Sequence, residues 1–259
     1  MVYKNIIVKE DGGVALITVN RPRVMNALNT ETINELITAV KNLEKNKEVK
    51  VVILTGEGKA FIAGADINEM KDMTPVQAKA FSELGGELIG SIEKSRLPFI
   101  AAVNGYTLGG GCEVMMACDI AIASTTAVIG QPEINLGIPP GFGGTQRLPR
   151  LIGKMKAKEM LFTGEYLNAS EAFSMGLVCG VVEPDQLMEK ALALADKIKS
   201  KSNLQISFIK SLVNTGMETD IISACRLETA LFSLSFSTKD QKEGMSAFLG
   251  KRKPVFKDE

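Results

Sequence analysis

Three consecutive glycines at positions 109–111 constrain this chain more than any other feature of its sequence. They stand directly before a helix-forming run at residues 113–117, an order that predicts a loop entering the N-terminus of a helix. The first N–H groups of a helix have no partner within it, and the helix dipole makes that end positive. Because glycines let a ligand approach the backbone closely, the segment predicts a place where a developing negative charge is stabilised.

Two carboxylates belong to this part of the sequence. Glu113 falls in the first turn of the predicted helix, and Glu133 follows a short strand-like run in the segment 131–133, Gln-Pro-Glu. Either residue alone is more commonly a surface residue than a catalyst. Together, in glycine-rich surroundings, they are candidates for acid–base catalysis, because two carboxylates in an apolar site can hold different protonation states.

The chain contains no histidine. This absence excludes Ser-His-Asp and Cys-His catalysis and any His-ligated metal site. Acid–base chemistry must therefore come from Glu, Asp, Lys, Tyr or Cys. The four cysteines show no C-x-x-C spacing, which indicates reduced thiols rather than disulfides or a zinc site. We predict no metal site.

Composition narrows the function classes further. Lys plus Arg and Asp plus Glu number 30 each, so no overall field attracts nucleic acid or an anionic membrane. No apolar run approaches the roughly 20 residues of a membrane span, and residues 1–7 show no signal-peptide pattern, so we expect a cytoplasmic protein. Glycosidases also use two carboxylates, but three Tyr and no Trp leave little to stack on sugars. Residues 56–59 lack the spacing of a nucleotide-binding loop.

Alternating strand and helix patterns predict an α/β fold. A hairpin is expected around residues 11–13, and a parallel crossover is expected from the strand, helix and strand that follow. Residues 59–70 read as a strand-to-helix loop that turns at Gly64, and residues 131–144 as an irregular loop. Capping boxes are expected at 168–171 and 238–241. The strands expected are residues 5–8, 14–19, 49–54, 97–103, 119–123, 127–130 and 178–182, and the helices are 30–46, 74–93, 145–162 and three or four pieces from 185.

Strand signals stop before the last sixty or so residues. We therefore predict a core with the active site at residues 1–197 and an α-helical appendage at residues 198–259. No internal sequence repeat is detectable, although strand–strand–helix periods recur loosely in the first part.

Four segments carry a resemblance to a known family: 63–67 (Ala-Gly-Ala-Asp-Ile), 109–113 (Gly-Gly-Gly-Cys-Glu), 130–133 (Gly-Gln-Pro-Glu) and 141–148 (Gly-Phe-Gly-Gly-Thr-Gln-Arg-Leu). With their spacing they resemble the enoyl-CoA hydratase (crotonase) family, and the likeness covers essentially the whole chain. The resemblance implies a crotonase (ClpP-like) spiral of ββα units with a C-terminal helical trimerisation region. It also implies a homo-oligomer, a hexamer built as a dimer of trimers.

The resemblance also implies roles for individual residues. The N–H groups of Ala65 and Gly110 would form the oxyanion hole for a thioester carbonyl. Glu113 and Glu133 would hold one water between them, with the Gly141 N–H as a further anchor. Glu113 would activate the water and Glu133 would donate a proton to C2, although this division of labour is left open. The residues expected to bind coenzyme A or its thioester are Ala63, Ala65, Asp66, Ile67 and Gly110.

Keeping both glutamates is typical of the hydratases of this family, whereas its isomerases commonly keep one. The resemblance therefore favours reversible syn addition of water to a trans-2-enoyl-CoA, giving a 3-hydroxyacyl-CoA, with no cofactor beyond the coenzyme A thioester substrate. The alternatives are an enoyl-CoA isomerase and a non-catalytic or RNA-binding member. Neither a nucleic-acid partner nor a membrane is expected. Acyl-chain length and physiological direction, fatty-acid breakdown or butyrate-type fermentation, stay open.

Overall fold

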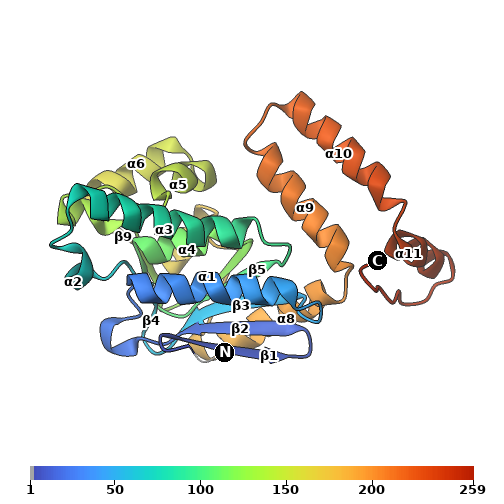
Figure 1. Ribbon diagram of the computed structural model, residues 1–259, viewed down its shortest axis with the longest axis horizontal. Helices are drawn as coiled ribbons and strands as arrows, with labels where there is room; N and C mark the ends of the chain where they lie inside the picture. The colour runs from blue at the N-terminus through green and yellow to red at the C-terminus, as the bar shows by residue number, and fades with distance from the viewer. Residues whose placement is uncertain (1–2) are drawn as a thin grey trace.

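The computed structural model describes residues 3–259 as two β-sheets with surrounding helices and a C-terminal helical extension (Figure 1). The larger sheet has the order β1-β2-β3-β5-β7-β10. Its first two strands form the predicted antiparallel hairpin, and the others add in parallel. The strands are β1 (Ile6–Asp11), β2 (Val14–Val19), β3 (Val51–Gly56), β5 (Phe99–Val103), β7 (Ile120–Ser124) and β10 (Gly180–Val182).

The smaller sheet has the order β4-β6-β8-β9. Its strands are β4 (Ala60–Ala63), β6 (Tyr106–Leu108), β8 (Val128–Gly130) and β9 (Tyr166–Asn168). The sequence predicted β8, which falls in the expected strand 127–130, but it missed β4, β6 and β9, because three or four residues do not establish an alternating pattern. In each of the consecutive pairs β3/β4, β5/β6 and β7/β8, the first strand belongs to the larger sheet and the second to the smaller sheet, and a helix follows. The strand–strand–helix repeat is therefore present.

Helices cover both faces of the larger sheet. On one face lie α1 (Thr30–Lys45) and α3 (Pro75–Glu93), which pack against each other, and on the other face lies α8 (Leu187–Lys199). Strand β3 shows why its sequence is continuously apolar: Val52 and Leu54 join the cluster under α1 and α3, while Val51 and Ile53 join the cluster under α8. Asn29 caps α1, and the Thr74–Gln77 pair forms a capping box on α3.

The glycine run leads into helix α4 (Gly110–Ala117), which begins three residues earlier than the sequence predicted. Gly109 has φ +49°, a backbone region that disfavours any side chain. At Gly111, an added Cβ would lie 1.9 Å from the carbonyl oxygen of Ile62. Glycine at this position therefore lets α4 pack directly on the backbone of β4.

Shorter helices fill the connections. The segment predicted as an irregular loop at Gln-Pro-Glu is a 3₁₀ helix, η2 (Pro132–Leu136), because proline at its first position suits a helix start. The predicted capping box at 238–241 is one-sided: Thr238 accepts from the Gln241 N–H, but the Gln241 side chain bonds Met245 instead of returning. The remaining short elements are η1 (Pro22–Val24), α2 (Ile67–Met70), α5 (Gly144–Ile152), α6 (Lys154–Thr163), α7 (Ala169–Ser174) and η3 (Pro184–Gln186).

The C-terminal extension consists of α9 (Asn203–Gly216), α10 (Ile221–Ser235) and α11 (Lys239–Leu249). The α9–α10 hairpin projects from the two-sheet body, and α11 follows beyond the C-terminal end of α10 (Figure 1). Lys210 on α9 joins the hairpin to the body, with its ammonium bonded to the carbonyls of Ile92 and Leu97 and to Asp119. Within residues 3–259, no helix combines the length and the apolar character needed to cross a bilayer.

Candidate active site

Glu113 is buried in the first turn of α4, with 1% of its surface exposed. Its Oε1 accepts two backbone hydrogen bonds, from the N–H groups of Phe142 at 2.8 Å and Gly144 at 2.6 Å. Burial raises the pKa of this carboxyl, while the two N–H donors and the positive charge of Arg147 act in the opposite direction. Glu113 is thus a buried carboxyl whose ionised form has dedicated donors.

Glu133 lies in η2 and is also buried, with 9% of its surface exposed. Burial is the largest cause that raises its pKa to about 7, and the negative charge of nearby Glu113 adds to the effect. Its Oε2 atom has no hydrogen-bond partner within residues 3–259. The structure therefore brings the two predicted carboxyls together and gives them different surroundings, with the pKa of both raised by burial and that of Glu133 raised to about 7.

Ala65 lies where the chain leaves β4. The Leu28 N–H donates to the Gly64 carbonyl, and the Asp66 N–H donates to the Leu28 carbonyl, both at 2.8 Å, which makes a parallel bridge between Leu28 and Ala65. In such a bridge, the N–H of the central residue points away from its partner. The Ala65 N–H has no acceptor within residues 3–259.

Gly110 opens α4, so its N–H has no acceptor within the helix and none elsewhere in the described chain. The carbonyl of the same peptide unit, that of Gly109, accepts from the Glu113 N–H at 3.0 Å and from Gln131 Nε2 at 2.9 Å. A Cβ built on Gly109 would lie 3.7 Å from the Cα of Gly64. The two segments that carry the predicted oxyanion-hole donors therefore lie side by side, at the ends of the paired strands β4 and β6.

Gly141 was predicted to anchor the water through its N–H. In the structure its carbonyl accepts from the Ser82 hydroxyl at 2.5 Å, and its N–H has no acceptor within residues 3–259. Its neighbours Phe142 and Gly144 donate their N–H groups to the Glu113 carboxylate, and the role of Gly141 stays a prediction. The sequence marked this glycine-rich loop as functional, but loop backbone directions follow from packing and are not readable from residue types.

The residues predicted to bind the substrate surround the same turn. Asp66 is the N-cap of α2 through the Asn68 N–H, and its other carboxylate oxygen lies 3.1 Å from Arg21 Nη2. Its side chain is therefore already bonded, so that a ligand would meet mainly backbone here. Ala63 is half-buried, and Ile67 is exposed.

Gln131 is a residue that the sequence reasoning missed. It is fully buried, its Nε2 donates to the Gly109 carbonyl, and its Oε1 has no partner within the described chain. Its place two residues before Glu133 was the only signal for it, and that signal does not show which way an amide points.

A cavity of about 520 Å³ lies between the start of α1, α2 and α3. Phe81, which lines it, packs against Phe142 with 5.5 Å between ring centroids. The cavity thus borders the site through this aromatic pair. Within residues 3–259, no group of three or more Cys, Asp or Glu side chains is arranged to hold a metal ion.

Comparisons with known proteins identify the family of this chain. The family model described as enoyl-CoA hydratase/isomerase matches residues 9–259. The short-chain-enoyl-CoA hydratase of Clostridium acetobutylicum is 48% identical over 254 residues, which cover 98% of this chain and 97% of that protein. The crotonyl-CoA hydratase of Syntrophomonas wolfei is 48% identical over 257 residues, 99% of either chain. The chain belongs to the enoyl-CoA hydratase/isomerase family.

Solved structures confirm the predicted fold class. The crystal structure of an enoyl-CoA hydratase from Bacillus anthracis superposes with a TM-score of 0.96 at 39% identity, covering 99% of this chain and 100% of that one. An enoyl-CoA hydratase structure from Geobacillus kaustophilus gives 0.97 at 34% identity, covering 100% and 98%. The α/β crotonase spiral with a C-terminal helical region is therefore the fold of this chain.

Proposed function

We propose that this protein is an enoyl-CoA hydratase, a hydro-lyase that adds water reversibly to a trans-2-enoyl-CoA and gives a 3-hydroxyacyl-CoA. The observation that carries the proposal is the pair of buried carboxyls, Glu113 and Glu133, in different surroundings beside two unpaired backbone donors. The enoyl-CoA hydratase names of the relatives at 48% identity point to the same reaction.

Each residue contributes one part of the chemistry. Glu113, held as a carboxylate by the Phe142 and Gly144 N–H groups, accepts a proton from the water whose oxygen bonds C3. Glu133, whose pKa of about 7 leaves it largely protonated below neutrality, donates its proton to C2 as the double bond is consumed. The Ala65 and Gly110 N–H groups stabilise the enolate oxygen that forms between these steps. Reversing the proton transfers gives dehydration, and no cofactor is needed.

The decisive measurement is the loss of enoyl-thioester absorbance on crotonyl-CoA. We expect turnover by the wild type, and a fall in kcat of about 100- to 10,000-fold in Glu113→Gln and in Glu133→Gln, because each removes one proton-transfer group. Glu83→Gln, a change of an exposed glutamate on α3, is the matched control and should leave kcat unchanged. A wild type that does not hydrate crotonyl-CoA but moves the double bond of a 3-enoyl-CoA to the 2-position would make the protein an isomerase. Wild-type activity in both glutamine variants would refute the assignment of the site.

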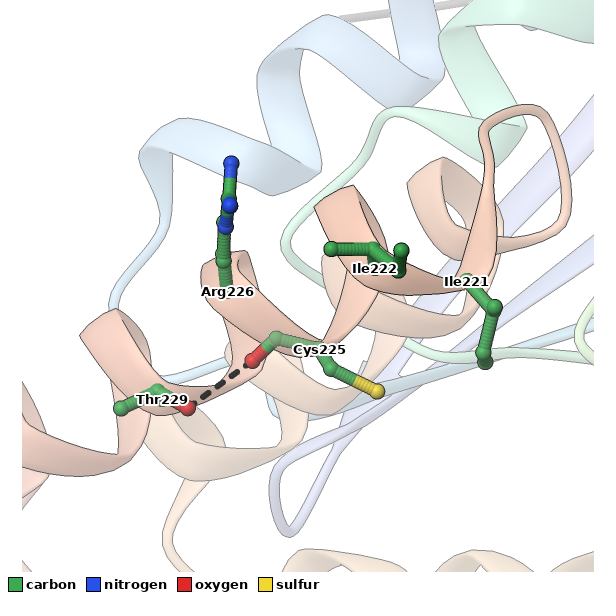
Figure 2. Close-up of a pocket in the computed structure, with 5 residues that line it drawn as sticks. All are labelled: Ile221, Ile222, Cys225, Arg226 and Thr229. Atoms are coloured by element: carbon green, nitrogen blue, oxygen red, sulfur yellow. Dashed lines mark hydrogen bonds between the residues drawn. The ribbon is translucent and has the colours of Figure 1, made fainter.

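We also propose that the protein is a homo-oligomer, a hexamer as a dimer of trimers, assembled through the C-terminal helices. Helix α10 buries none of its residues and packs chiefly against α9. A hollow of about 360 Å³ lies on this helix. Figure 2 draws the residues that line it: Ile221, Ile222, Cys225, Arg226 and Thr229. Apolar side chains exposed to this extent indicate a surface that another subunit covers. Those exposed by half or more on α9–α11 are Ile209, Val213, Met217, Ile221, Ile222, Phe232, Leu234, Met245, Phe248 and Leu249.

Light scattering after size exclusion tests this assembly. We expect six times the mass of the 27.8 kDa chain for the wild type, and a smaller species for Ile222→Asp, because a charge on that face is costly to bury. Val76→Asp places the same charge at an exposed apolar residue of α3 and should leave the mass unchanged. A monomeric wild type would refute the proposal.

The four cysteines are free in the structure, which suits the cytoplasm that we propose as the protein's location.

A further inference from the structure

The loop 141–144, which supplies both donors to Glu113, packs on helix α3 at several points. The Ser82 hydroxyl donates to the Gly141 carbonyl at 2.5 Å, and the Phe142 ring lies against Phe81. A Cβ on Gly85 would lie 2.1 Å from that ring, so the aromatic side chain rests directly on the helix backbone. Helix α3 therefore contacts this loop through the side chains of Ser82 and Phe81 and through its own backbone at Gly85.

Arg147, on α5, holds the same loop from its other end. Its Nε and Nη2 donate to the two carboxylate oxygens of Glu93 on α3, at 2.6 and 2.7 Å. Its Nη1 donates to the Phe142 carbonyl at 3.2 Å. Both side chains are about a quarter to a third exposed, and a two-pronged pair of this kind fixes direction as well as distance.

The contact with Ser82 bears on Glu113 through the planarity of the peptide bond. The Gly141 carbonyl and the Phe142 N–H belong to one rigid peptide unit, so a bond to the carbonyl oxygen directs the N–H on the opposite side. That N–H donates to Glu113. The Phe142 carbonyl, which Arg147 holds, belongs to the next peptide unit, between the two N–H groups that reach Glu113.

We propose that Ser82, Glu93 and Arg147 are positioning residues for the hydration, which hold segment 141–144 so that the Phe142 and Gly144 N–H groups stay directed at Glu113. The inference rests on the proposed function, because it assigns these contacts a role in that reaction. None of the three residues touches Glu113 through a hydrogen bond of its own. They act through the loop, and their loss lets the donors move away from the carboxylate.

The kinetic test uses Ser82→Ala and Arg147→Lys in the full-length protein. We expect kcat on crotonyl-CoA to fall about 10- to 100-fold in each, since a displacement of about 1 Å can have that effect, with KM changed by less than about threefold. Glu93→Gln should resemble Arg147→Lys, and Ser82→Thr, which keeps the hydroxyl, should retain most of the activity. Ser91→Ala and Arg150→Lys are matched controls, because Ser91 bonds only within α3 and Arg150 pairs with exposed Glu218.

The pH dependence of kcat separates positioning from a general loss of stability. With fewer hydrogen-bond donors, the Glu113 carboxyl is harder to ionise and its pKa rises. The acidic limb of the pH dependence of kcat should therefore move to higher pH in Ser82→Ala and Arg147→Lys. The titratable groups that surround Glu113 are Cys112 on α4, Glu133 on η2, Arg147 on α5 and, through Arg147, Glu93 on α3. Since Ser82 carries no charge, a shift in Ser82→Ala comes from the loop and not from a lost cation. A lower urea midpoint with an unmoved limb and unchanged kcat would overturn the proposal.

Amide hydrogen exchange of the loop tests the same contacts without the reaction. We expect the Phe142 and Gly144 amides to exchange at least tenfold faster in Ser82→Ala and Arg147→Lys than in the wild type or the controls. If the wild type fails to hydrate crotonyl-CoA but exchange rises in this way, the loop contacts stand and the proposed function falls. If the wild type is active and both variants keep its kcat, the function stands and the positioning role is wrong.

Discussion

At the scale of single residues, two identical side chains acquire different acid–base properties from their surroundings. Glu113 has two backbone donors and a nearby arginine, whereas Glu133 has a neighbouring negative charge and an oxygen without a partner among residues 3–259. The sequence predicted both glutamates as the catalytic pair but left their division of labour open. The difference comes from groups supplied by a loop that is distant along the chain.

These surroundings predict a bell-shaped pH dependence of kcat. The proposed mechanism needs Glu133 protonated, so the rate should fall as pH rises through about 7. It also needs Glu113 ionised, and because burial raises that pKa above its ordinary 4.5, the acidic limb should lie above pH 4.5. Initial rates on crotonyl-CoA between pH 4.5 and 9 measure both limbs, and Glu133→Gln should lose the alkaline one. A flat profile up to pH 9 would contradict the role of Glu133 as the acid.

The raised pKa of Glu133 also predicts a change of stability with pH. A folded-state pKa of about 7 against 4.5 means that the folded chain binds the proton more tightly, so this contribution is complete below pH 4.5 and is lost as pH rises through 7. At pH 8 the free energy of unfolding of Glu133→Gln, measured with urea, should therefore exceed that of the wild type by about 2–3 kcal/mol at most. The difference should vanish near pH 4.5. Equal stabilities at pH 8 would mean that the carboxyl is better solvated than its burial indicates.

At the scale of elements, the site depends on how closely α4 approaches β4. Gly111 allows that approach, and the helix start at Gly110 follows from it. The sequence predicted the helix and its glycine-rich entry, because both are local patterns. It missed β4 and β6, whose three or four residues carry no periodicity, although β4 is the surface on which α4 packs.

Gly111→Ala should destabilise the fold, because its Cβ would lie 1.9 Å from a backbone oxygen that cannot rotate away. Overpacking of this kind costs about 1–3 kcal/mol, and more where backbone must shift. Gly86→Ala in α3 is the control: its Cβ meets nothing within 4 Å, so alanine should stabilise the helix by about 0.5–1 kcal/mol. Urea denaturation at one protein concentration compares the two, and equal midpoints would refute the packing argument.

At the scale of the whole molecule, a buried lysine connects the C-terminal helices to the two-sheet body. Lys210 is 7% exposed, and its ammonium is bonded to two carbonyls and to Asp119, 2.8 Å away. Asp119 also accepts from the Phe99 N–H. The boundary that the sequence predicted between residues 197 and 198 falls within α8 (Leu187–Lys199), whereas Lys210 lies on α9, the first helix of the extension.

Lys210→Met should destabilise the protein by about 1–3 kcal/mol, because it leaves the Ile92 and Leu97 carbonyls without their donor and the partly exposed Asp119 carboxylate without its counter-charge. Adding Asp119→Asn should recover part of the loss. Lys158→Met, at an exposed position of α6, is the control and should be neutral within about 0.5 kcal/mol. Urea denaturation measures the global effect, and limited proteolysis between α8 and α9 measures release of the extension. An unchanged midpoint in Lys210→Met would show that the pair adds nothing to stability.

The sequence by itself determined what depends on local pattern: the apolar strands of the larger sheet, the capped helices α1 and α3, the hairpin, and the two glutamates in glycine-rich segments. Only the tertiary structure decided which N–H groups hold Glu113, that Gln131 and Ser82 bond the backbone of the two functional loops, and that the sheet divides in two. The physical reason is that hydrophobic periodicity and capping act over a few residues. The directions of loop peptides and the pKa of a buried carboxyl depend instead on groups that packing brings together from distant parts of the chain.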